Sequence, residues 1–158
     1  MPHITIEYTI MIPVLILQIF LFPLTASWLM NIWVDSRRTL VLQDAAGHLG
    51  SIIQQLYFSL NHDTITSANI TCSPGLPPFI EDKYYSGTAV LESVGADVNS
   101  GKVLKLTMTL TGTKNSVTTS VILGPNARWV NSTFYSNSTS AVVSAGKVGG
   151  LVYLQFGE

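Results

Sequence analysis

Residues 8–34 contain no Lys, Arg, Asp or Glu, and this apolar run constrains the fold more than any other feature of the sequence. A helix of 18 or more apolar residues is long enough to cross the roughly 30 Å hydrocarbon core of a bilayer. The run is framed by Glu7 before it and Asp35 after it. The sequence therefore raises a specific question, which is why a single carboxylate precedes a segment whose composition suits lipid.

Two simple interpretations explain this run only in part. A secretory signal peptide has a basic start, a short apolar core and a small-residue cleavage site. Residues 1–7 contain no Lys or Arg, and the apolar run is too long for such a core. A plain membrane anchor explains the hydrophobicity, but it accounts neither for Glu7 nor for the residues that follow Asp35.

Residues 35–61 continue the apolar run with a different pattern. Apolar side chains recur there at spacings of three and four, which marks one face of an amphipathic helix: Leu42, Ala45, Leu49, Ile52 or Ile53, Leu56 and Leu60. No turn signal separates the two segments, so we predict one helix from about residue 5 to about 60, roughly 80 Å long. Pro13 and Pro23 lie inside it, and each favours a bend or local melting because it removes a backbone hydrogen bond.

Residues 62–158 are rich in Thr, Ser, Gly, Val and Asn, a composition typical of strands and turns. Residues 102–112 alternate apolar and polar side chains, and a turn joins them to a second strand, which predicts a hairpin. Further short strands are expected at residues 87–94, 128–135, 139–145 and 150–156. The sequence thus predicts an α+β protein, with a long helix in residues 1–61 and a small antiparallel β-sandwich or barrel in residues 62–158.

Three Asn-x-Ser/Thr sequons lie in the β-rich part, at Asn69, Asn131 and Asn137. They favour a surface exposed to a glycosylating compartment, and hence an external head. Arg37 and Arg38 point the other way, because positive residues beside a membrane segment generally stay cytoplasmic. The two arginines are offset by Asp35, so we expect the external arrangement.

The order of these features resembles that of a type IV pilin. If the mature chain begins at His3, Glu7 is its fifth residue and Tyr8 its sixth, and "ITIEYTIMIPVLIL" is similar to the start of Tad/Flp-type pilins, TadE-like pseudopilins and archaeal pilins. Members of these families carry a short, usually basic leader that ends in Gly or Ala, whereas Met-Pro precedes His3 here. The resemblance covers about residues 3–60.

The resemblance implies a function in assembly. The apolar half of the helix would sit in the membrane first and then pack with other copies in a filament core, with Glu7 pairing with the α-amino group of a neighbouring subunit. The residues implied in assembly are Glu7, Tyr8, Pro13 and Pro23. The implied partners are many copies of the chain itself, the membrane, a prepilin peptidase, and an assembly platform with its ATPase. The sequons fit an archaeal cell-surface filament for adhesion or attachment.

The sequence favours neither an enzyme nor a cofactor-binding protein. His3, His48 and His62 have no metal-ligand spacing, and Cys72 is the single cysteine, so no metal site or disulfide framework is expected. The net charge of −1 gives no indication of nucleic-acid binding. Two alternatives to a major pilin stay open: a single-pass, membrane-anchored β-sandwich that binds a ligand, and a minor pilin or pseudopilin of a pilus or secretion machine.

Overall fold

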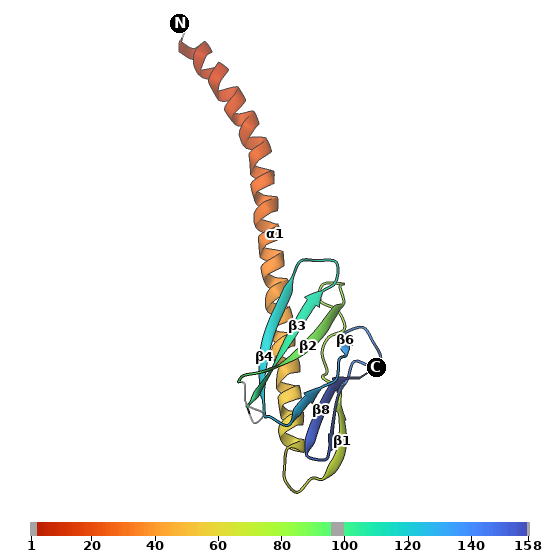
Figure 1. The fold of residues 1–158 in the computed structure, drawn as a ribbon. Helices are drawn as coiled ribbons and strands as arrows, with labels where there is room; N and C mark the ends of the chain where they lie inside the picture. Colours follow the sequence, from red (N-terminus) through yellow and green to blue (C-terminus); the bar gives the residue numbers. More distant parts are fainter. Residues whose placement is uncertain (1–2, 96–99, 158) are drawn as a thin grey trace. The chain divides into compact units, whose positions relative to one another are not determined.

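The structure is a computed structural model that describes residues 3–95 and 100–157, with side chains from Thr9 onward. By its internal contacts the chain divides into two compact units, residues 1–37 and residues 38–158. A single helix, α1 (His3–Leu60), contributes to both units, and eight strands follow it (Figure 1). The expected α+β class, with a long N-terminal helix ahead of a β-rich head, is confirmed.

The N-terminal unit consists of helix alone. All large apolar side chains between Ile10 and Trp33 are at least 46% exposed, with no apolar stripe that faces other residues of the described chain. This helix is long and apolar enough to span a membrane by length and composition. A helix that is apolar all round requires lipid or protein as its surroundings.

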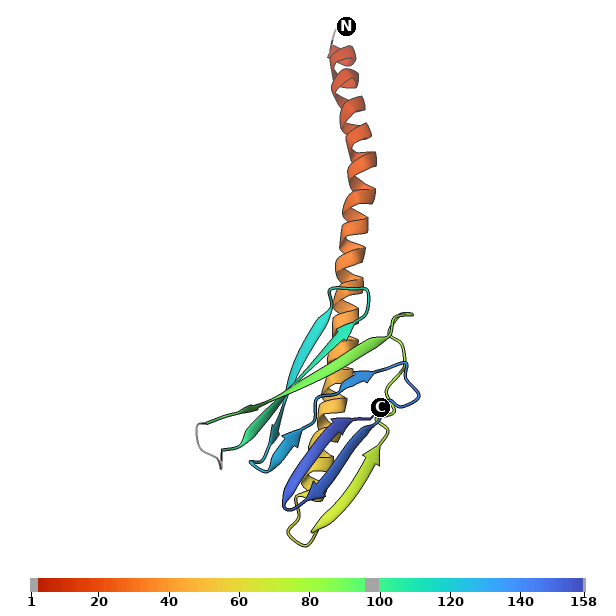
Figure 2. The same cartoon turned by 45° about the vertical axis from the view of Figure 1, so that its right-hand side comes forward.

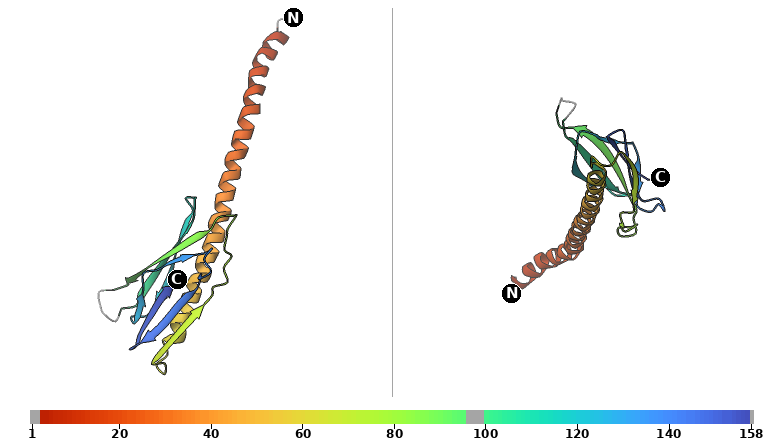
Figure 3. Two further views of the ribbon diagram at one scale, coloured as in Figure 1. Left: turned by 90° about the vertical axis from the view of Figure 1, so that its right-hand side faces the viewer. Right: turned by 90° about the horizontal axis from the view of Figure 1, so that it is seen from below.

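The second half of α1 differs from the first in the burial of its side chains, although both halves have the same helical backbone. One face is buried at the spacing that the sequence indicates, at Leu42, Ala45, Ala46, Leu49, Ile53, Leu56, Tyr57 and Leu60. In the two views of Figure 3, this yellow-orange part of α1 runs alongside the strands. Residues 38–60 therefore belong by their contacts to the same unit as the strands.

Two four-stranded sheets make up the rest of this unit (Figure 2). One sheet has the order β4-β3-β2-β6, formed by β4 (Ser116–Leu123), β3 (Lys102–Leu110), β2 (Tyr85–Ser93) and β6 (Thr133–Tyr135). The other has the order β1-β7-β8-β5, formed by β1 (Ser67–Cys72), β7 (Val143–Val148), β8 (Leu151–Phe156) and β5 (Ala127–Trp129). All pairs are antiparallel except β5 with β8, which is parallel.

The hairpin predicted for residues 102–112 and the strand after them forms as expected. Strands β3 and β4 pair over their length, and the side chains of Leu104, Leu106, Met108 and Leu110 are fully buried on one face. Strands β7 and β8 are joined by Gly149 and Gly150, whose φ values of 59° and 83° suit a two-residue hairpin turn. The closing strand buries Phe156 and exposes Tyr153, as the alternation predicts.

The prediction of one strand over residues 128–135 is wrong. The chain changes sheets there, with β5 in one sheet and β6 in the other, and Val130 donates its backbone N–H to the Leu154 carbonyl at 2.9 Å. Ser132 Oγ then accepts the N–H of Phe156 at 2.9 Å. These bonds satisfy the backbone of the crossing, so the two short strands replace one longer one.

Two other strand boundaries differ from expectation. The strand expected at residues 139–145 begins only at Val143, because Ala141 donates to the Ser138 carbonyl in a turn. No strand is predicted at residues 67–72, but they form β1 at the edge of a sheet. Only alternate side chains of β1 reach the core, so its sequence carries a weak apolar signal.

The helix and both sheets share one hydrophobic core. Two lysines lie inside it rather than on the surface, and each donates to a backbone carbonyl: Lys102 Nζ to Ala127 at 2.7 Å and Lys147 Nζ to His62 at 2.8 Å. The carbonyl of His62 follows the end of α1, where a positive charge is also favoured by the helix dipole. Burial, with Arg128 nearby, lowers the pKa of Lys102.

A polar cluster fastens the end of α1 to the strands. The Tyr57 hydroxyl donates to Asn126 Oδ1, and Asn126 Nδ2 donates to Asn61 Oδ1 at 2.7 Å and to the Gly150 carbonyl at 3.0 Å. Gly124 lies so close to the Tyr57 hydroxyl that a Cβ at this position would overlap it. One asparagine thus connects the last turn of the helix with the β7–β8 turn.

Candidate assembly surface

The candidate assembly surface is the apolar half of α1, residues 9–33. Its exposed side chains lie on all sides of the helix, and the most exposed is Phe22 at 76%. Glu7 and Tyr8 lie in the same helix ahead of this surface, and their side chains are outside the part of the chain that the structure describes. The assembly role expected of these two residues therefore stays a prediction.

Pro13 and Pro23 are both accommodated inside α1, which continues without interruption through them. Figure 1 shows a gentle curve in this region, so a bend rather than a break accompanies the prolines. Pro23 has no N–H to donate to the carbonyl four residues before it. Two residues further on, the Thr25 hydroxyl lies 3.1 Å from the Leu21 carbonyl and 2.9 Å from the Phe22 carbonyl.

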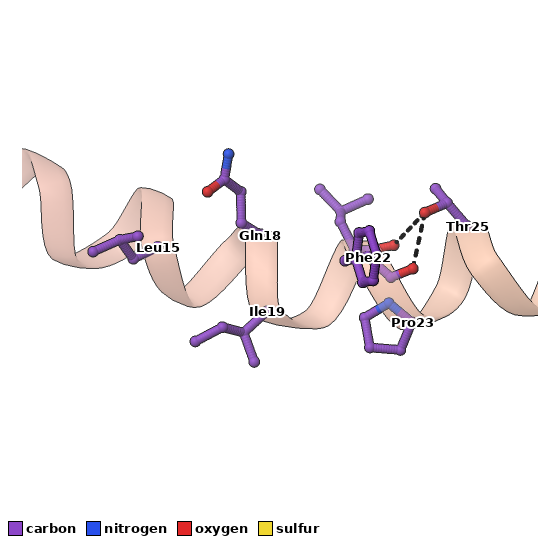
Figure 4. A pocket seen from close by; sticks show the side chains of 7 residues that line it. Leu15, Gln18, Ile19, Phe22, Pro23 and Thr25 are labelled. Carbon is purple, nitrogen blue, oxygen red and sulfur yellow. Dashed lines mark hydrogen bonds between the residues drawn. The ribbon is translucent and has the colours of Figure 1, made fainter.

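Thr25 therefore satisfies its own polar group within the helix. Such bonds from a Thr hydroxyl to its own backbone also bend helices slightly. In Figure 4 the hydroxyl points back toward the turn that precedes Pro23, while the Gln18 side chain points away from the ring of Pro23. Leu15, Gln18, Ile19 and Pro23 line an open hollow of about 740 Å³ beside this turn.

Gln18 and Asn31 are polar groups of another kind. Both lie within the apolar surface and are exposed, and their side-chain amides make no hydrogen bond to any residue that the structure describes. In hydrocarbon an amide side chain favours a hydrogen-bonding partner on a neighbouring helix. These two amides are therefore candidates for hydrogen bonds to a neighbouring helix.

The two arginines at the end of this surface differ in their contacts. Arg37 lies over the ring of Trp33, with its guanidinium carbon 5.8 Å from the ring centroid. Arg38 Nε instead lies 2.7 Å from Glu81 Oε2 in the β-rich unit. An Arg over a Trp ring suits the boundary between an apolar layer and water. The division between the two units thus falls between two neighbouring cations with separate roles.

The three sequons are exposed at their asparagines. Asn69 lies on β1, Asn131 between β5 and β6, and Asn137 in the turn after β6. Exposure is the condition that glycosylation requires of a folded acceptor, and each of the three positions meets it. The prediction that they carry glycans stays open.

The remaining candidate residues have local structural contacts. His48 Nε2 lies 3.0 Å from the Pro74 carbonyl and His62 Nδ1 lies 3.0 Å from Thr64 Oγ1. Cys72 is a free thiol, partly buried against the core. Among the described residues, no three His, Cys, Asp or Glu side chains form a group that could hold a metal ion.

The comparisons with known proteins add no relative. No family model, no curated protein and no solved structure matches this chain.

Proposed function

We propose that this chain is the structural subunit of a type IV pilus-like filament, which polymerises through the apolar half of α1. The observation that carries the proposal is the exposure, on all sides, of the large apolar side chains from Ile10 to Trp33. Burying one such side chain away from water contributes about 1.5–3 kcal/mol. The segment is therefore driven into lipid before assembly and must keep an apolar environment afterwards.

Three features favour assembly over simple anchoring. Gln18 and Asn31 present amides that lipid cannot satisfy but neighbouring helices can. Glu7 supplies one carboxylate at the start of the surface, which is costly in a low-dielectric core unless it is paired. The uncharged run of residues 8–34 also exceeds the roughly 20 residues that one crossing needs.

In this proposal the two units have separate tasks. The helix surface forms the filament core, and the β-rich unit, with its three exposed sequons, forms the outer surface. Because lipid already solvates the apolar helix, transfer into the filament is governed by packing and polar pairing more than by the hydrophobic effect. Pairing at Glu7 then guides each subunit into position.

The test is filament yield after substitution of Glu7. Cells that make Glu7→Ala should yield at least about tenfold less of this chain in the filament fraction sheared from their surface, since each 1.4 kcal/mol of lost pairing is tenfold. Electron microscopy with mass spectrometry of the same fraction measures the yield. The chain should remain in the membrane fraction.

The matched control is Asp44→Ala, which removes an exposed acid from the other half of the same helix. It should leave the filament yield unchanged. A Glu7→Ala yield equal to that of the wild type would exclude the pairing role of Glu7.

The main competing function is a single-pass anchored binding protein, favoured by a helix that is long enough to span a membrane. Shearing would then leave the wild-type chain in the membrane, and detergent would release it as a small species. A minor pilin would instead occur in filaments at low abundance beside another major subunit.

A further inference from the structure

The outer face of the β1-β7-β8 sheet carries a shallow hollow beside one of the sequons. The hollow has a volume of about 430 Å³, and its lining includes Ser67, Asn69, Ser144, Gly146, Tyr153 and Gln155. In Figure 2 the yellow-green β1 lies beside the two blue strands whose outward residues complete the lining. Lys147 also lines the hollow, but its Nζ donates to the His62 carbonyl, and the other polar side chains of the lining are uncharged.

The strand register explains the hollow. Asn69 pairs with Gly146 on the neighbouring strand, and Gly146 pairs with Tyr153 on the next one. With strands about 4.8 Å apart, Asn69 and Tyr153 stand about 10 Å apart in one row, with only a glycine between them. The absence of a side chain at the middle position is what opens the space.

Gly146 is not required by the backbone or by crowding. A Cβ built at this position would meet Asn69 Oδ1 at 3.6 Å and the Ala68 carbonyl oxygen at 3.8 Å, which is ordinary van der Waals contact, and its φ is not in the left-handed region. Glycine inside a strand weakens it and often marks a place where a ligand approaches closely. Neither the backbone conformation nor the neighbouring atoms therefore explain why glycine occupies position 146.

The two side chains that flank Gly146 fit a saccharide. The Asn69 carboxamide is exposed, makes no hydrogen bond to the described residues, and belongs to the sequon Asn69-Ile70-Thr71. Tyr153 is 40% exposed and offers an aromatic ring, on whose apolar face a pyranose ring can stack. Ser144 and Gln155 provide hydroxyl and amide groups in the next row.

We propose that this hollow is the seat of an Asn69-linked glycan, whose first sugar lies over Gly146 and stacks against Tyr153. The glycan would then form part of the folded surface rather than extend freely into solvent. The inference rests on the external location of the head under the proposed function. Asn131 and Asn137 lie in a loop and a turn, outside this hollow.

The test uses the full chain in detergent, purified from cells that attach N-linked glycans. Glycopeptide mass spectrometry should find Asn69 occupied. Asn69→Gln should lower the melting temperature of the head by about 3 °C, whereas Asn137→Gln should leave it within error. An unoccupied Asn69, or equal shifts for the two variants, would overturn the proposal.

Gly146→Val distinguishes the contribution of the glycan to the melting temperature from that of the unglycosylated sheet. In the unglycosylated Asn69→Gln background this substitution should leave the melting temperature unchanged or raise it, because valine suits a strand. With Asn69 glycosylated it should lower the melting temperature, since the side chain fills the seat. Tyr153→Ser should lower the melting temperature in both backgrounds, because serine suits a strand less well than tyrosine, but the loss should be larger when Asn69 is glycosylated. A shift that is the same in both backgrounds would contradict the assignment.

These results are independent of filament formation. A chain that stays in membranes but shows the Asn69-dependent shift would exclude the polymer and retain the glycan seat. Filaments whose subunits carry no glycan at Asn69 would exclude the glycan seat and retain the polymer.

Discussion

The two halves of α1 have the same secondary structure but opposite relations to the rest of the chain. Between residues 9 and 33 the described side chains are exposed on every side, whereas between residues 42 and 60 one face is fully buried in the core of the head. The difference arises from the pattern of apolar residues rather than from helix propensity. A helix that carries its own amphipathic pattern finds its partner within the chain, and one that is uniformly apolar must find it outside.

The largest effect that separates the halves is expected from matched leucine truncations. Leu49 is fully buried and Leu24 is 68% exposed. Leu49→Ala should lower the free energy of unfolding of the head by about 2–5 kcal/mol because it leaves a cavity in the core. Leu24→Ala should leave the unfolding of the head unchanged.

Denaturant unfolding in detergent, followed by Trp129 fluorescence in a Trp28→Phe, Trp33→Phe background, measures this difference. Trp129 is then the single tryptophan, and it lies in the head. Equal destabilisation by the two leucine substitutions would show that the apolar half also contributes to the stability of the head.

The next effect concerns the contact between Tyr57, on the amphipathic half of α1, and Gly124. Gly124→Ala should cost about 1–3 kcal/mol, because the new methyl group would overlap the Tyr57 hydroxyl. In a Tyr57→Phe background the cost should fall by about 0.5 kcal/mol or more, since the overlapping oxygen is gone. A double-mutant cycle from chemical denaturation measures this coupling.

Gly47→Ala provides a control of opposite sign on the same half of α1. Gly47 is exposed, and a Cβ there would have no atom within 4 Å. The substitution should therefore stabilise the head by about 0.5–1 kcal/mol through helix propensity alone. A loss of stability at Gly47 would indicate an unrecognised partner for that face.

Alkaline pH should destabilise the head while sparing the apolar half. Burial raises the pKa of Tyr85 from 10.0 to about 12, and its hydroxyl donates to the Pro77 carbonyl at 2.7 Å. Between these two values the unfolded chain loses the Tyr85 proton while the folded chain keeps it, so stability falls as pH rises from about 10 to 12. Helicity of residues 9–33 has no such dependence.

Tyr85→Phe isolates this contribution. The variant should lose about 1 kcal/mol at neutral pH with the hydrogen bond, and the alkaline decline that is specific to Tyr85 should disappear. The lowered pKa of Lys102 makes stability rise with pH below about pH 10.5, which is the opposite sign. Both proteins contain Lys102, so its contribution cancels when their free energies of unfolding are subtracted at each pH. An unchanged decline in the variant would assign it to other groups.

The difference between the two halves of α1 was largely predictable from sequence, whereas the polar contacts that connect α1 to the strands of the head were not. Periodicity places Leu42, Leu49 and Leu60 on the buried face, and alternation predicts the β3–β4 hairpin. Both patterns depend on local repeats of apolar residues, which one sequence displays directly. The three sequons likewise specify candidate surface positions without any structure.

The features that sequence reasoning missed are those set by distant parts of the chain. Lys102 and Lys147 occupy inward positions because backbone carbonyls from other segments accept hydrogen bonds from their amines. The contacts of Asn126 connect the helix end with the β7–β8 turn, and neither partner is visible from the local pattern. The seat beside Asn69 depends on the register of three strands, so the sequon alone does not reveal it.

The smallest expected effect lies at the boundary itself, where Arg38 begins the head unit. Its partner Glu81 and the neighbouring Asp82 have φ values of 46° and 63° in the tight turn between Ile80 and Lys83. Positive φ is unfavourable for Glu, so this turn is strained. The ion pair between Glu81 and Arg38 connects the turn to the helix. A double-mutant cycle of Arg38→Ala and Glu81→Ala should give a coupling of about 0.5 kcal/mol, reduced by salt. The more exposed Lys105–Glu92 pair serves as the control, and its coupling should be smaller. If the two couplings were equal, the Arg38 contact would be an ordinary surface pair, and the boundary between the halves would be set by apolar burial alone.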